Sequence, residues 1–277
     1  MRYNAARPPT GTGAALAKLL AIARNTYREA IRDRILYGFL FFAIALILFS
    51  LVLGRLSFNQ QIRCTIDVGL AGISLFSVLI AIFLGVTLLH KEIEKRTIYP
   101  VLAKPVSRAA YLLGKFLGLA ATMAVLEALM AAVFIVLLAL EGGSVHAGLF
   151  VALGLVFVET LLVLALALFF TSFSSPFLSG LFCLGLFAVG RNAQLLAELA
   201  KNEKLAWLGP LLDGVTAVVP NLYMFYPSGK VVEQTWATVL GQYVSNGYVA
   251  WTVGYGLGYT ALLLVLAAFL LGRRDFV

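Results

Sequence analysis

Charged side chains are scarce in this chain, and their scarcity excludes an ordinary soluble protein. Asp, Glu, Lys and Arg make up 12% of the 277 residues and hydrophobic residues 61%, whereas soluble domains carry roughly 25% charged residues. Apolar runs of about 18 residues or more recur, and each can cross a hydrocarbon core of about 30 Å at about 1.5 Å per residue. Stretches such as LFFAIALILF lack the alternation of a transmembrane β-strand. The composition therefore predicts an all-α integral membrane protein.

Motifs for metal, redox and hydrolytic chemistry are also missing. The two cysteines are Cys64, expected in a loop, and Cys183, expected inside an apolar span, so a disulfide framework is not predicted. The patterns CxxC, HExxH and GxSxG do not occur, which counts against a zinc site and a serine hydrolase. The first apolar run begins only near Ile35, which argues against a cleavable signal peptide.

A phosphate-binding loop is missing as well. The two Gly-Lys pairs, Gly114–Lys115 and Gly229–Lys230, lack both the leading glycine and the following Ser or Thr of such a loop. We therefore expect no catalytic residue, no metal site and no bound cofactor in this chain. It should not hydrolyse ATP by itself.

Six apolar spans can be drawn along residues 35–271, the predicted transmembrane domain. The fifth is short, because its apolar stretch stops at Arg191. Ser175 followed by Pro176 is typical of a helix N-cap with proline at the first helical position. The six spans are Ile35–Leu53, Val68–Leu89, Leu112–Leu140, Ala147–Thr171, Phe177–Val189 and Val249–Leu271.

The distribution of positive charge favours six spans with both termini in the cytoplasm. In that arrangement fifteen Lys and Arg residues lie in inside segments and six, Arg191 among them, lie outside, in accordance with the positive-inside rule. Without the fifth span, Arg273 and Arg274, in the predicted cytoplasmic C-terminus at 272–277, would lie outside. The net charge of +8 is thus explained by topology, since no soluble basic domain is present to bind nucleic acid.

Residues 1–34 are predicted to form a cytoplasmic tail and an amphipathic helix. Apolar residues recur at three- and four-residue spacing: Leu16, Leu19, Leu20, Ala23, Tyr27, Ala30 and Ile31. A basic row recurs at four-residue spacing: Arg24, Arg28 and Arg32. Such a helix suits the headgroup level of the cytoplasmic membrane face. Packing against a soluble partner is the alternative.

Residues 191–248 form a long segment expected outside the cytoplasm. Helical patches broken at Gly209–Pro210 precede an aromatic stretch, VVPNLYMFYPSGK. Tyr and Trp are typical of the membrane interface, so we expect short helices lying on the outer face. They would form either a lid over the bundle or a substrate-recognition domain.

Two acidic residues, Glu127 and Glu159, fall near the middle of the third and fourth spans. A short turn at Glu141–His146 should make these spans antiparallel neighbours, with the two carboxyl groups at similar depth. A carboxylate inside a membrane is costly unless it is protonated, paired or facing water. The pair therefore predicts either a proton-relay or substrate-contact site, or a protonated acid hydrogen-bonded between helices.

Pairs of glycines four residues apart occur in two spans. Gly114 and Gly118, and again Gly254 and Gly258, have the spacing that permits close helix approach. Internal packing and a dimer seam explain the spacing equally well.

The connection at residues 90–115, HKEIEKRTIYPVLAKPVSRAAYLLGK, carries six of the 21 Lys and Arg residues. Pro100 and Pro105 limit how far a helix can extend across it, and Ser107 is a plausible N-cap for the third span. Acids, bases and the apolar stretch TIYPVL alternate here, which a simple turn does not need. An orientation anchor without a partner is the alternative.

These residues resemble a known family. Glu92, Glu94, Arg96–Thr97–Ile98, Leu102, Lys104–Pro105–Val106–Ser107–Arg108 and Leu113–Gly114–Lys115 are similar to the signature that follows the second span in ABC-2 type transporter permeases. The entry helix, the six-span plan and the ending GRRDF are also similar, especially to the branch related to the nitrous-oxide-reductase maturation permease.

The resemblance implies a permease subunit of a bacterial inner-membrane transporter. It would pair with a second permease subunit, in a homodimer or pseudo-dimer, and with cytosolic ATPase subunits that bind ATP and Mg²⁺. The initial amphipathic helix would be an elbow helix, and 91–108 a coupling helix docked on the ATPase. The coupling residues implied are Glu92, Glu94, Lys95, Arg96, Thr97, Ile98, Leu102, Pro105, Ser107 and Arg108. The alternatives are a proton-coupled carrier using Glu127 and Glu159, and a membrane scaffold that moves nothing.

Overall fold

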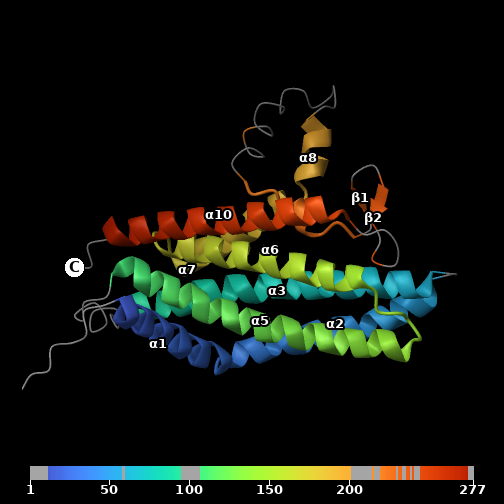
Figure 1. Ribbon diagram of the computed structural model, residues 1–277, viewed down its shortest axis with the longest axis horizontal. Helices are drawn as coiled ribbons and strands as arrows, with labels where there is room; N and C mark the ends of the chain where they lie inside the picture. Colours follow the sequence, from blue (N-terminus) through green and yellow to red (C-terminus); the bar gives the residue numbers. More distant parts are fainter. Residues whose placement is uncertain are drawn as a thin grey trace, which may run out of the picture.

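A computed structural model shows a bundle of long apolar helices. It describes residues 12–57, 60–94, 107–200, 214, 219–228, 230–232, 235–237, 239 and 244–273. Within these residues, five helices are long and apolar enough to cross a membrane: α2 (Arg34–Leu56), α3 (Gln61–Glu94), α5 (Arg108–Leu140), α6 (Ala147–Thr171) and α10 (Asn246–Arg273). They lie side by side along the long axis of the molecule (Figure 1). The prediction of an all-α membrane bundle is confirmed at this level.

The central helix of the bundle is α3. In its most apolar stretch, 72% of the residues are buried inside the protein, whereas the corresponding fractions are 22% for α2 and 28% for α10. It packs against α2, α5 and α6. It begins at Gln61, before the apolar run starts, so Cys64 lies in its first turns and not in the predicted loop.

The predicted hairpin of α5 and α6 is confirmed. A short turn over Glu141–His146 joins the two helices, and they pack against each other. Gly142 in this turn has φ of 75°, in the left-handed region that glycine adopts without steric cost. The turn fixes the register between the helices that carry Glu127 and Glu159.

The N-terminal helix α1 (Thr12–Ile31) packs along the first turns of α5. Glycine makes this close approach possible, because a Cβ atom on Gly114 would lie 2.9 Å from the side chain of Ile22, and one on Gly118 would collide with the carbonyl oxygen of Ala23. Internal packing therefore explains this glycine pair. Gly254 and Gly258 of α10 are exposed, and no atom lies within 4 Å of a Cβ added at either position.

The next helix, α7 (Pro176–Arg191), begins where the sequence predicted, with Ser175 at the N-cap position and Pro176 in the first turn. The Ser175 side chain makes no capping hydrogen bond. With 16 residues, α7 is about 24 Å long, short of the roughly 30 Å of a hydrocarbon core.

The segment after α7 contains the predicted short helices and also a hairpin. Its helices are α8 (Ala193–Ala200), which stands out from the side of the bundle in Figure 1, and the 3₁₀ turn η2 (Leu222–Phe225). Strands β1 (Lys230–Val232) and β2 (Thr235–Ala237) pair antiparallel, with Val231 opposite Trp236. The hairpin was not predicted, although its β-branched and aromatic residues favour strands.

One end of the bundle gathers the end of α3, the start of α5 and the end of α10, and Asp33, which follows α1, reaches it through Lys91 (Figure 1). Arg108 Nη1 donates a hydrogen bond of 2.8 Å to the carbonyl oxygen of Leu271, and Lys91 Nζ lies 3.4 Å from Asp33 Oδ2. We call this the connection end, because residues 95–106, which join α3 to α5, leave from it.

Candidate functional site

The only two acidic residues within α5 and α6 lie inside the bundle. Glu127 of α5 is 4% exposed and Glu159 of α6 is 0% exposed. The two carboxyl groups are near enough for their charges to interact, as the hairpin predicted. Hydroxyl groups surround them: Ser74, Ser77 and Thr160. We call Glu127, Glu159, Arg191 and these three hydroxyl residues the polar centre.

Glu159 is held by partners from two other helices. Arg191 Nη1 forms an ion pair with Glu159 Oε1, and Ser74 Oγ donates a hydrogen bond of 3.1 Å to Oε2. Arg191 reaches this depth because α7 ends there instead of continuing past the midpoint of α6. A buried carboxylate with a guanidinium and a hydroxyl partner retains its charge without leaving an uncompensated ion.

Arg191 is also held from the opposite side, by the aromatic segment that follows η2. Its guanidinium lies 4.4 Å from the ring centre of Tyr226 and 5.8 Å from that of Phe187, within the range of a cation–π contact. The hydroxyl of Tyr226 donates to the carbonyl oxygen of Asp67 at 2.9 Å, and Ser228 Oγ donates to Asp67 Oδ1 at 2.7 Å. Tyr226 and Ser228 thus tie the segment after η2 to α3 and, through Arg191, to the polar centre.

Glu127 has a different environment. Its Oε2 atom is buried and has no hydrogen-bond partner among the described residues, although the hydroxyls of Ser77 and Thr160 face the carboxyl group. No ion pair to Glu127 forms within the part of the chain that the structure describes. A buried carboxyl group without a cation is stable only in its neutral, protonated form.

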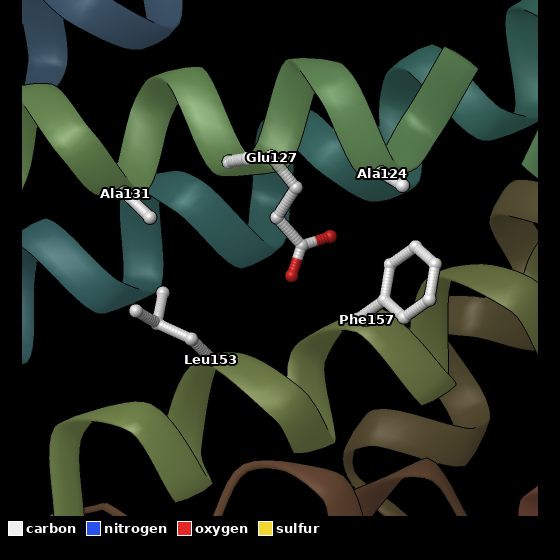
Figure 2. A pocket seen from close by; sticks show the side chains of 6 residues that line it. Ala124, Glu127, Ala131, Leu153 and Phe157 are labelled. Carbon is white, nitrogen blue, oxygen red and sulfur yellow. The ribbon is translucent and has the colours of Figure 1, made fainter. Parts of the chain in front are cut away.

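A groove of about 240 Å³ separates α5 from α6 beside Glu127. Small residues on α5, namely Ala124, Ala128 and Ala131, leave the space open. Figure 2 shows the carboxyl group of Glu127 pointing across this space toward α6, between Leu153 and Phe157. The polar centre therefore has one acid paired with arginine and one acid without a cation partner among the described residues, at an apolar groove.

Metal binding has no support in the described residues, since no three His, Cys, Asp or Glu side chains gather there. The polar centre can bind or release a proton at Glu127. When protonated, the carboxyl group of Glu127 can also donate a hydrogen bond to a ligand in the groove. Both roles need no cofactor.

Four of the ten implied coupling residues are described, and they fall at the connection end. Ser107 is the N-cap of α5, as predicted, because its Oγ accepts a hydrogen bond of 3.2 Å from the backbone N–H of Ala110, and Arg108 binds the end of α10. Glu92 and Glu94 belong to the last turn of α3. The others lie outside the described residues: Lys95, Arg96, Thr97, Ile98, Leu102 and Pro105.

The basic row of α1 is exposed as predicted. Arg24, Arg28 and Arg32 all point away from the core, while Thr26 and Ala30 are buried against the bundle.

Lys115, predicted as part of the charged connection, lies instead inside α5 and is 1% exposed, with its Nζ 3.7 Å from Glu29 Oε2 of α1. The connection is therefore shorter than the sequence suggested, because α3 and α5 extend into it.

The sequence did not indicate that Arg191 and the hydroxyl residues Ser74, Ser77 and Thr160 belong to the polar centre, or that Tyr226 contacts Arg191. The prediction placed Arg191 outside, in a loop, whereas the structure pairs it with Glu159. The signal was present, since the apolar run of α7 ended too early to reach the far side. Tyr226 carried no signal, because its contact with Asp67 joins residues 159 positions apart.

A helical bundle that crosses a membrane several times and buries ionisable groups at its middle is typical of proteins that move substrates or protons across membranes. The fold and the polar centre thus define a membrane transport component. A family model described as ABC-2 family transporter protein matches residues 20–276, and the chain belongs to this family. It is therefore a membrane permease of the ABC transporter class. No curated protein matches the chain.

Proposed function

We propose that this chain is the permease subunit through which a separate cytosolic ATPase drives export, or conformational work, across the membrane. The supporting observation is that both helices flanking residues 95–106 run directly into the polar centre. Ser74 and Ser77 belong to α3, and Glu127 belongs to α5. Because long packed helices move as rigid elements, a displacement of the connection is transmitted to these side chains.

In the membrane, the chain crosses six times with both termini in the cytoplasm. Arg108 contacts the end of α10, which supports a common side for the connection and the C-terminus. The fifth crossing contains α7, which alone is too short to span the hydrocarbon core, and α10 forms the sixth. The connection end then faces the cytoplasm of a bacterial cell, and α1 serves as the elbow helix.

The partners are a second permease subunit, in a homodimer, and ATPase subunits that hold ATP and Mg²⁺. Residues 91–108 act as the coupling helix that docks on the ATPase. The segment at residues 191–248, apart from Arg191 in the polar centre, faces the extracytoplasmic side, where it contacts substrate or a further protein. Kinship with the nitrous-oxide-reductase maturation branch is part of this proposal and rests on the sequence signature alone.

The proton-coupled carrier is less well supported. Such a carrier would use Glu127 and Glu159 as an exchanging pair. Arg191 and Ser74 hold Glu159 in its ionised form, which leaves Glu127 as the single exchangeable acid of the polar centre.

Affinity purification from native membranes tests the proposal. The wild-type chain should co-purify with a subunit that carries a phosphate-binding loop and hydrolyses ATP. Glu94→Ala combined with Arg96→Ala should reduce its recovery at least about tenfold. The matched control, Arg55→Ala combined with Glu141→Ala, makes the same charge change away from the connection end and should leave recovery unchanged. Absence of an ATPase from the wild-type complex would refute the proposal.

A further inference from the structure

A charged pocket of about 470 Å³ lies between α1 and the end of α3. Three cations line it, Arg28, Arg32 and Lys91, together with two acids, Glu29 and Asp33. The polar centre is remote from this pocket, and neither the family signature nor the coupling proposal gives the pocket a role.

Both acids of the pocket are already engaged. Asp33 Oδ2 pairs with Lys91 Nζ at 3.4 Å, and its Oδ1 accepts a hydrogen bond of 3.0 Å from the backbone N–H of Ile35. Glu29 Oε2 pairs with the buried ammonium group of Lys115 at 3.7 Å. These contacts neutralise the carboxylates, so that neither acid offsets the charge of the two arginines.

Arg28 and Arg32 are exposed and form no ion pair within the described part of the chain. They lie four residues apart, so their side chains are neighbours on one helix face. Two guanidinium groups present parallel N–H donors that match phosphate oxygens in a bidentate geometry. The pocket therefore suits an oxyanion such as a phosphate group better than a neutral ligand.

Exposed apolar residues earlier on α1 and one apolar residue of the pocket identify the source of the phosphate. On α1, Leu16 and Leu20 are 58% and 55% exposed, and such residues on a basic amphipathic helix enter the acyl-chain region of a membrane. Leu88 adds an apolar wall to the pocket itself. We infer that the pocket binds the headgroup phosphate of an anionic phospholipid at the connection end. The inference depends on α1 lying at the membrane surface and not on coupling to an ATPase.

Lipid retention by the purified chain tests this site. Native mass spectrometry would compare dioleoyl phosphatidylglycerol with dioleoyl phosphatidylcholine, added to delipidated protein in detergent. Wild type should retain phosphatidylglycerol selectively. Arg28→Gln combined with Arg32→Gln should weaken retention by about fivefold for each arginine removed. Arg28→Lys combined with Arg32→Lys should give an intermediate loss, because the charge remains while the bidentate geometry is lost.

The matched control is Arg34→Gln combined with Arg55→Gln, which removes the same charge from exposed positions that neither line the pocket nor belong to the basic row. This variant should retain the lipid within about twofold of wild type. Equal losses of lipid retention in the two glutamine double variants would show that the lipid is held by diffuse attraction to surface charge and not by this pocket. That result would overturn the inference. Displacement of the bound lipid by millimolar inorganic phosphate would overturn the assignment to a lipid. Size-exclusion profiles matching wild type establish that every variant is folded.

Discussion

Arg191 and Glu159 form an ion pair inside the bundle, although one ends α7 and the other lies near the midpoint of α6. Glu159 is fully buried, and the Arg191 side chain is 19% exposed. A helix that crossed the whole membrane would carry its terminal arginine past this depth. The short length of α7 is therefore what supplies a counter-charge to the buried acid.

Removing either partner of this pair should destabilise the protein strongly. Arg191→Met and Glu159→Gln each leave a polar group without its buried partner, a change that typically costs about 3–5 kcal/mol. The loss of unfolding free energy in the double variant should be smaller than the sum of the two single losses by at least about 1 kcal/mol. Unfolding of detergent-solubilised protein, followed by tryptophan fluorescence, gives the double-mutant cycle.

The exposed pair of Arg63 and Asp67 is the control for that cycle. Their atoms Nε and Oδ2 lie 3.9 Å apart, and the side chains are 39% and 37% exposed. Solvent screening should reduce the coupling of Arg63→Met with Asp67→Asn to about 0.5 kcal/mol or less. Purely additive effects at Arg191 and Glu159 would contradict a direct pair.

Tyr226 offers two separable contacts, a ring over Arg191 and a hydroxyl bonded to Asp67. Tyr226→Phe keeps the ring and should cost about 0.5–1.5 kcal/mol for the lost hydrogen bond. Tyr226→Leu also removes the cation–π contact and should cost about 1 kcal/mol more. The same unfolding measurement checks both values, and identical effects of the two substitutions would show that the ring contributes nothing.

Gly118 and Gly258 give a matched pair of glycines in long helices. Gly118→Ala places a methyl group against the carbonyl oxygen of Ala23 and should loosen α1 from α5, at a cost of about 1–3 kcal/mol. Gly258→Ala meets no atom within 4 Å and should be neutral or stabilising by up to about 1 kcal/mol, because alanine favours helices. Limited proteolysis of α1 reports the loosening. Equal protease sensitivity of the two variants would refute the close contact.

The hydrophobic pattern predicted the helices well, because each apolar run must form its own backbone hydrogen bonds inside a membrane. The predicted Ala147–Thr171 span matches α6 in both boundaries. Helix ends in polar sequence were less predictable. Lys115 could not be recognised as buried, because its partner Glu29 lies on a helix that is distant in the sequence.

The site was half predictable for a similar reason. The cost of an acid inside the membrane singled out Glu127 and Glu159 from the sequence alone. Which of them is ionised depends on the depth reached by Arg191, and that depth follows from tertiary packing of α7. Local patterns carry no information on such a contact.

The two acids should differ in their reaction with a hydrophobic carbodiimide. A protonated carboxyl group adds across the carbodiimide and rearranges to a stable N-acylurea, whereas an ionised, arginine-paired carboxylate does not react. Glu127 is buried without a cation partner among the described residues and lies at a groove, so dicyclohexylcarbodiimide should modify it at least about tenfold faster than Glu159. Peptide mass spectrometry locates the adduct.

Two variants serve as controls for this labelling. Ala131→Leu fills the groove and leaves Glu127 in place, so it should slow the labelling, whereas Glu127→Gln should abolish it. Modification of Glu159 at a comparable rate would show that Arg191 does not keep that acid ionised.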